Sequence, residues 1–165
     1  TYFSGGNSSA LSLLEKEGLP SRINHLRVGE AVLLGTDVTN MRSFPWLRQD
    51  TMEFQAEIVE LRRKPSVPLG ERGADAFGNI PQFEDRGLRL RAIVAMGRQD
   101  VRLEGLTPAD PRMTILGASS DHMILDVEDA GSLKMGDVIS FRPDYGAMLQ
   151  GVTSAYVEKC VREER

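Results

Sequence analysis

The chain has 165 residues, of which 41% are hydrophobic and 27% charged, so it has enough apolar residues to build a folded core. Its 20 Lys and Arg residues against 24 Asp and Glu residues give a net charge of -4, which argues against a surface for nucleic acid or an anionic membrane. The one cysteine, Cys160, excludes an internal disulfide and metal or redox sites built on paired cysteines, and it favours the cytoplasm. No apolar run approaches the roughly 20 residues that a membrane-spanning helix needs.

The first 36 residues predict two strand–helix units in succession. A short apolar strand leads into Gly5 and Gly6, and Asn7 or Ser8 can cap the helix that follows. Residues 23–28 predict a second strand, and the apolar residues 31–34 predict a short helix after it. The chain begins without Met, so we expect these units to be part of something longer.

From residue 52 onward the hydrophobic pattern has the period of two that is typical of half-buried strands. Further strands are predicted at residues 52–62, 88–96, 113–116, 122–127, 138–141 and 156–161. A long loop is predicted at residues 65–87, and loops of more than about 12 to 15 residues are often functional, although a surface excursion held by its own prolines is an equally good interpretation.

Both predicted strand–helix junctions carry groups that could bind a phosphate. Glycines allow the backbone to approach a ligand closely, and the N–H groups of a first helical turn face an anion. A glycine-rich turn with a Ser or Asn cap is also common without any ligand. Two consecutive units of this kind resemble the phosphate site that (β/α)8 barrels form after their last two strands, in which case about six units would lie upstream.

Four stretches, taken together, resemble the fold-type III pyridoxal-phosphate enzymes of the alanine racemase superfamily. They are Asn-Ser-Ser-Ala at 7–10, the glycine-containing stretch at 26–35, the strand and loop at 92–100, and the motif at 118–127. The long loop, with Pro-Ser-Val-Pro-Leu-Gly-Glu, Phe-Gly-Asn and Glu-Asp-Arg-Gly, is most similar to the ornithine racemase-like branch of amino-acid racemases.

The resemblance implies a mainly β fold with two parts. Residues 1–36 would be the last two βα units of a TIM-type barrel whose upstream part is absent, and residues 37–165 would be a C-terminal β-domain of the alanine racemase type. It also implies a homodimer with shared active sites. The activity implied is racemisation of ornithine or a related amino acid.

The resemblance further implies that pyridoxal 5'-phosphate is the cofactor and that four residues hold it. Ser8 matches the serine that binds the phosphate, and the backbone N–H groups of Gly29 and Glu30 would bind it as well. Arg27 would approach the pyridine nitrogen and keep it unprotonated, which favours simple reprotonation of the substrate carbanion. No metal site is predicted.

The substrate side of the site would be formed by Arg98, Ser120 and Asp121, of which Arg98 and Asp121 are the catalytic candidates. Arg98 occupies the position of the tyrosine that serves as the second base in the family. A guanidinium remains protonated at ordinary pH and only donates hydrogen bonds, so Arg98 cannot take a proton from carbon. It could instead hold the substrate carboxylate or stabilise carbanion charge.

The identity of a second base therefore stays open among His122, Tyr145, Tyr156 and Asp121. A histidine has a suitable intrinsic pKa, but a histidine in a strand is more often structural.

The family's cofactor lysine lies on the first barrel strand, and none of the lysines at positions 16, 64, 134 and 159 matches a cofactor motif. We therefore expect the 165 residues alone to be inactive. Two alternatives remain: a pyridoxal-phosphate-dependent decarboxylase or racemase acting on another amino acid, and a non-catalytic β-domain for dimerisation or ligand binding.

Overall fold

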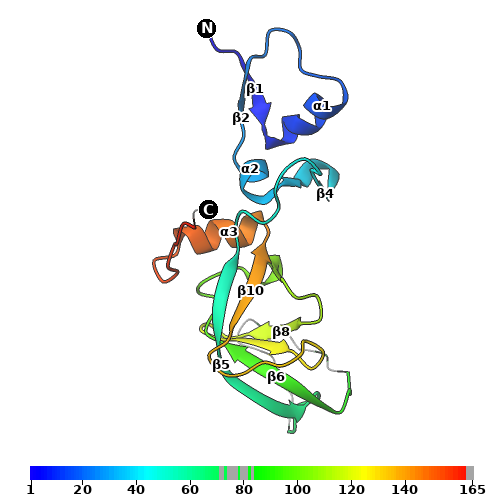
Figure 1. The fold of residues 1–165 in the computed structure, drawn as a ribbon, viewed down its shortest axis with the longest axis vertical. Helices are drawn as coiled ribbons and strands as arrows, with labels where there is room; N and C mark the ends of the chain where they lie inside the picture. Colours follow the sequence, from blue (N-terminus) through cyan, green and yellow to red (C-terminus); the bar gives the residue numbers. More distant parts are fainter. Residues whose placement is uncertain (71–72, 74–77, 79–81, 83, 163–165) are drawn as a thin grey trace. The chain divides into compact units, whose positions relative to one another are not determined.

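The computed structural model describes residues 1–70, 73, 78, 82 and 84–162, which form two compact units divided between Glu53 and Phe54 (Figure 1). The first unit contains β1 (Ser4–Asn7), the 3-10 helix η1 (Ser8–Ala10), α1 (Leu11–Lys16), β2 (His25–Arg27), α2 (Glu30–Leu34), β3 (Thr36–Asp37), η2 (Val38–Asn40) and β4 (Arg42–Ser43). The second contains β5 (Phe54–Pro65), β6 (Leu88–Val94), η3 (Leu103–Gly105), β7 (Leu106–Pro108), β8 (Thr114–Ala118), β9 (Met123–Asp126), β10 (Val138–Pro143) and α3 (Tyr145–Thr153).

The first unit has the two consecutive strand–helix units that the sequence predicts. Strands β1 and β2 are parallel neighbours, and η1 and α1 form the connection between them. Helix α2 ends at Gly35, whose φ of 67° lies in the left-handed region that glycine adopts without strain. The assignment of residues 1–36 to a barrel stays a prediction.

A short segment after α2 is held by polar contacts, both within the segment and with α1. The side chain of Asp37 has no exposed surface, and it accepts hydrogen bonds from the side chains of Asn40 at 2.9 Å and Arg42 at 3.0 Å. Arg42 also pairs with Glu15 on α1. Burial opposes ionisation of Asp37, but the donors from Asn40 and Arg42 outweigh it and lower the pKa of this carboxyl group.

The second unit is a six-stranded antiparallel sheet with the strand order β7-β10-β5-β6-β9-β8. Strand β5 joins its two halves, because residues 54–57 pair with β10 and residues 58–65 pair with β6 (Figure 1). The register shifts between Ile58 and Glu60, so Val59 is an extra residue in a β-bulge, which increases the local twist.

The predicted period of two explains the core of this unit. Phe54, Ala56 and Ile58 of β5 are buried, and so are Ala92 and Val94 of β6. The mainly β fold is therefore confirmed. Strands β7, β3 and β4 are not predicted by the sequence, because two or three residues are too short to show a period.

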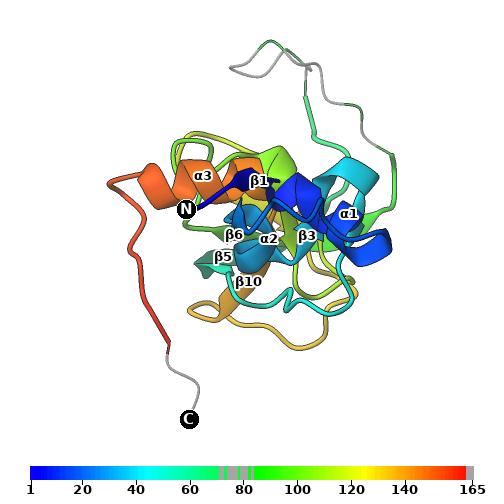
Figure 2. The ribbon, with the colours of Figure 1, turned by 90° about the horizontal axis from the view of Figure 1, so that it is seen from above.

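The strand predicted at residues 156–161 is wrong. These residues follow α3 and form no strand, and Tyr156 and Val161 are 81% and 95% exposed. Figure 2 shows this segment as an extended stretch that leaves the end of α3 without joining the sheet. Aromatic and β-branched residues gave the sequence a strand-like composition, but the segment has no neighbouring strand with which to pair.

Helix α3 packs against the sheet through its small residues. Asp144 caps the helix by accepting a hydrogen bond from the Ala147 N–H at 2.9 Å. Gly151 faces the ring of Phe54 so closely that a Cβ atom there would overlap the ring.

Among the described residues, no helix is long and apolar enough to cross a membrane.

A partly buried ion pair joins β6 to β9. The Arg89 Nε donates to Asp126 at 2.9 Å, and these two side chains are 20% and 12% exposed. Burial favours the neutral form of Asp126, but hydrogen bonds from Arg89 and from the Glu128 N–H overcome this effect and lower its pKa.

We expect Asp126→Asn to destabilise the chain by about 1.5–3 kcal/mol at pH 7, because it removes a charge-assisted hydrogen bond. A carboxyl group whose pKa is lower in the folded state contributes stability above its unfolded pKa of about 4, and this contribution is lost as pH falls through the folded pKa. Urea unfolding should therefore show a difference between wild type and variant that shrinks below about pH 4. A difference independent of pH would contradict this role for the carboxylate.

Candidate functional site

The first group of predicted site residues lies where β1 and β2 end. These strands are parallel and adjacent, with Asn7 beside Arg27, so the turns that follow them meet at the same edge. The structure joins the two turns directly, because the Ser8 Oγ accepts a hydrogen bond from the Ala31 N–H at 3.3 Å. Ser8 therefore lies against the turn formed by Gly29 and Glu30.

The first turn is held by a side chain, whereas the second contains a glycine with open space around it. Asn7 holds the first turn, since its Oδ1 accepts from the Ser9 N–H at 3.0 Å and from the Ser9 Oγ at 2.7 Å. In β1, just before this turn, a Cβ atom at Gly5 would overlap the side chain of Ile23, so a larger residue there would require that side chain to move. At Gly29 a Cβ atom would meet no other described atom within 4 Å, which leaves the backbone of the second turn open.

Arg27 is connected to the neighbouring strand through its side chain. Its Nη1 donates a hydrogen bond to the Ser4 Oγ on β1. Because Ser4 is the first residue of β1 and lies beside His25, this contact directs the guanidinium back toward the start of the two strands. At the end of the strands the structure brings together Ser8, Gly29 and Glu30, which offer a hydroxyl group and backbone N–H groups to an anion. Arg27 is the last residue of β2, but its guanidinium contacts Ser4.

The second group lies in the other unit, where the loop after β6 packs against the turn between β8 and β9. Two backbone hydrogen bonds connect them, from the Arg98 N–H to the Ser119 carbonyl and from the Gln99 N–H to the Ser120 carbonyl, both at 3.0 Å. Gly97 is necessary for this contact, because a Cβ atom there would overlap the Ser120 carbonyl group. Arg98, Ser120 and Asp121 are therefore on neighbouring loops.

The Arg98 side chain forms an ion pair with Glu104, in which the Nη1 lies 2.7 Å from the Oε1. The Arg98 side chain is 25% exposed, whereas that of Glu104 is 59% exposed. The hydrogen bond from Arg98 lowers the pKa of the Glu104 carboxyl group, which keeps it ionised opposite the guanidinium.

Ser120 and Asp121 are at the exposed tip of the β8–β9 turn. Ser119 shapes this turn through its side chain, since its Oγ accepts from the Asp121 N–H at 3.4 Å and the His122 N–H at 3.1 Å. The Asp121 carboxylate therefore lies on an ordered turn and faces solvent.

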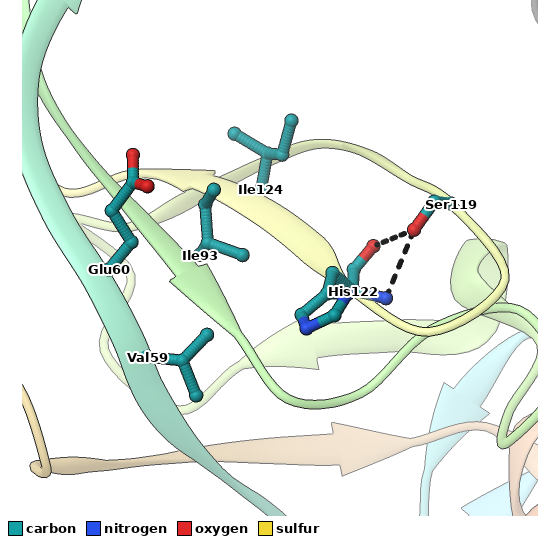
Figure 3. Close-up of a pocket in the computed structure, with 6 residues that line it drawn as sticks. All are labelled: Val59, Glu60, Ile93, Ser119, His122 and Ile124. Atoms are coloured by element: carbon teal, nitrogen blue, oxygen red, sulfur yellow. Dashed lines mark hydrogen bonds between the residues drawn. The ribbon is translucent and has the colours of Figure 1, made fainter.

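His122 lines an open depression of about 400 Å³ on the outer side of the sheet (Figure 3). The other residues that line it are the apolar Val59, Ile93 and Ile124 and the polar Ser119 and Glu60. Glu60 pairs with Lys64 at 2.6 Å, and the hydrogen bond from Lys64 lowers its pKa despite partial burial. Within the described part of the chain, no carboxylate lies at hydrogen-bond distance from the His122 ring.

The other candidates for a second base are exposed. Tyr145 begins α3 and is 46% exposed, and Tyr156 lies beyond the helix. Within residues 1–70, 73, 78, 82 and 84–162, no three His, Cys, Asp or Glu side chains gather in a way that could hold a metal ion.

Three residues with a part in these clusters were not predicted. Ser4 contacts Arg27, Ser119 shapes the turn that carries Ser120 and Asp121, and Glu104 pairs with Arg98. The serine pair at 119–120 is a turn signal that could have indicated Ser119. Glu104 has no sequence signal, because its pairing with a residue six positions earlier depends on how the loop folds.

Comparison with known proteins shows strong similarity over nearly the whole chain, although no family model matches it. The chain is 52% identical over 156 residues to the lysine racemase of Thermotoga maritima, and 52% identical over 157 residues to the ornithine racemase of Acetoanaerobium sticklandii. Each match covers 94% of this chain and 44% of the racemase. The chain therefore spans less than half the length of these relatives.

Solved structures show the same fold at low sequence identity. The biosynthetic alanine racemase of Pseudomonas aeruginosa matches with a TM-score of 0.64 and 17% identity, over 96% of this chain and 47% of the enzyme. The D-threonine aldolase of Filomicrobium marinum matches with a TM-score of 0.56 and 15% identity, over 89% of this chain and 34% of the aldolase. The resemblance predicted from the sequence is confirmed: this chain is homologous to part of the lysine and ornithine racemases and shares its fold with part of the alanine racemases.

Proposed function

We propose that this chain is the C-terminal half of a pyridoxal-phosphate-dependent racemase that acts on ornithine, lysine or a related amino acid. The observation that carries this proposal is 52% identity, over 94% of the chain, to one racemase named for each of these two substrates. The arrangement of the predicted site residues also supports it, because hydrogen bonds hold members of each group near one another.

The turns after β1 and β2 fit the phosphate group of the cofactor. The Ser8 hydroxyl group lies beside the second turn, and the open backbone at Gly29 leaves room for close approach of an anion. Ser8 and the N–H groups of Gly29 and Glu30 would hold the phosphate, and Arg27 would lie beside the pyridine nitrogen. When bound, pyridoxal phosphate supplies an electron-withdrawing ring that stabilises the charge left on the substrate when its α-proton departs.

Arg98 is proposed to bind the α-carboxylate of the substrate. A guanidinium presents donors in a planar fork that matches a carboxylate, and it keeps its charge throughout the reaction. Its backbone is fixed next to Ser120 and Asp121, which are proposed to complete this side of the site. Asp121 can accept a proton where Arg98 cannot, so it is the proposed acid–base group of the pair.

The rest of the enzyme is proposed to come from a longer protein and a second subunit. The cofactor lysine would lie on the upstream barrel strand, and we expect the 165 residues alone to be inactive. In a homodimer, the Arg98 group of one subunit would serve the cofactor site of the other. Cys160 is exposed and forms no disulfide, which agrees with a reducing compartment, and the cytoplasm is the proposed location.

The proposal is tested by giving the full-length protein a panel of L- and D-amino acids. We expect visible absorbance from bound cofactor and interconversion of the enantiomers of ornithine or lysine. Carbon dioxide release, or activity confined to other amino acids, would favour the alternative enzymes. A stable oligomer that never binds the cofactor would favour a non-catalytic β-domain.

For Arg98 we expect that Arg98→Ala in the full-length protein raises KM by about 10- to 100-fold, because a charged hydrogen-bonding partner of the substrate is lost. The visible absorbance of the cofactor should be unchanged. Arg98→Lys should recover only part of the affinity, since an ammonium group lacks the planar fork. Steady-state kinetics measure both effects, and wild-type KM in Arg98→Ala would remove Arg98 from the site.

A further inference from the structure

The ion pair between Arg98 and Glu104 joins two segments that are each anchored by other contacts. The Arg98 backbone donates to the Ser119 carbonyl at 3.0 Å and accepts from the Gln150 Nε2 at 2.9 Å. The segment that carries Glu104 is held by Leu103, which is buried in the core at 7% exposure. The position of either backbone therefore does not depend on the ion pair.

The ion pair is one contact that orients the long Arg98 side chain. Arginine has several rotatable bonds, and a ligand that binds a mobile guanidinium must overcome the entropy of ordering it. Glu104 engages the Nη1 and so restricts the plane of the group before any ligand arrives. Such preorganisation strengthens binding without adding a contact to the ligand.

We propose that Glu104 is a positioning residue, which holds the Arg98 guanidinium in the orientation that receives the α-carboxylate of an amino-acid substrate. This inference rests on the proposed function of Arg98. It predicts that Glu104 contributes to substrate binding only through Arg98. Glu104 does not contact the substrate in this account, because its negative charge would repel the substrate carboxylate.

Kinetics of the full-length protein test the proposal with four variants. Glu104→Ala should raise KM for the racemised amino acid by about tenfold while kcat changes much less, because misorientation of a binding group weakens substrate affinity. Glu104→Gln keeps an acceptor oxygen and should restore most of the affinity. In the Arg98→Ala background, Glu104→Ala should have no further effect. Arg112→Ala removes a surface ion pair of similar length, 2.8 Å to Asp110, and should leave KM unchanged.

Two kinetic outcomes would overturn the proposal: an unchanged or lower KM in Glu104→Ala, or single-variant effects that multiply in the double variant. A crystal structure of full-length Glu104→Ala separates this inference from the proposed function. We expect the Arg98 guanidinium to be displaced or to lose order while the backbone of residues 97–101 keeps its place. An Arg98 guanidinium that stays in position in this variant would refute the role of Glu104. If the guanidinium is displaced in the variant but the wild-type protein racemises no amino acid, only the proposed function is refuted.

Discussion

Gly97→Ala is expected to lower kcat/KM of the full-length protein by about 100-fold, because it displaces Arg98 from Ser120 and Asp121 by a distance on the order of 1 Å. The added Cβ atom would overlap the Ser120 carbonyl carbon and oxygen and lie only 2.5 Å from the Asp121 backbone nitrogen. These are backbone atoms, which cannot move away as the end of a flexible side chain can. The two loops must separate, and the hydrogen bonds from Arg98 and Gln99 would lengthen or break.

Gly117→Ala is the matched control for this prediction. Gly117 belongs to β8, and a Cβ atom there would meet no described neighbour within 4 Å. The same substitution should therefore leave activity within about twofold of wild type, as is usual for a change at an open position. Steady-state kinetics of both variants provide the comparison. Wild-type activity in Gly97→Ala would mean that the contact between these loops is not needed.

Phe141→Ala is expected to cost about 3–5 kcal/mol of the free energy of unfolding, the range for removal of a large buried aromatic side chain. Phe141 has no exposed surface and lies on β10 between Phe54 of β5 and Pro108 of β7. Its loss would open a cavity in the middle of the second unit. A change of this size is a large fraction of the stability of an ordinary domain, so we also expect partial unfolding near physiological temperature.

Urea unfolding measures this effect, with Tyr156→Ala as the control. Tyr156 is also aromatic but is 81% exposed, and its truncation should change the free energy of unfolding by less than about 0.5 kcal/mol. Equal effects from the two substitutions would contradict the placement of the core around Phe141.

The strands that could be predicted from the sequence are those with several alternating residues. Strands β5 and β6 are long enough for the alternation to be visible, and every second residue is buried at Phe54, Ala56 and Ile58 of β5 and at Ala92 and Val94 of β6. At the start of β6 the alternation no longer predicts burial, since Leu88 is 63% exposed although it lies an even number of residues before the buried Ala92. Composition alone does not say how far along a strand the core extends.

Pairing between distant segments could not be predicted, and this explains the errors. Residues 156–161 have the composition of a strand but no partner, while β7 has a partner in β10 but only three residues. The predicted loop at 65–87 is described only in part, and Phe77 and Asn79 of its Phe-Gly-Asn stretch lie outside the described residues.

In the candidate site, too, some contacts follow from the sequence pattern and others depend on the path of a loop. Ser8 and Gly29 follow parallel strands in consecutive strand–helix units, so their proximity follows from a pattern that the sequence contains. The pairing of Arg98 with Glu104 does not, because it depends on the path of the loop between β6 and β7. The roles of these residues in binding cofactor and substrate stay predictions that the variants above test.

The most direct test of the central proposal is the configuration of the product. The full-length protein, loaded with pyridoxal phosphate, is given one pure enantiomer at a time: L-ornithine, D-ornithine, L-lysine or D-lysine. Chiral chromatography over time measures both enantiomers. If this chain is half of a racemase for such amino acids, both starting materials of at least one pair will converge on equal amounts of the L and D forms. Loaded protein that leaves all four enantiomers unchanged would contradict the account.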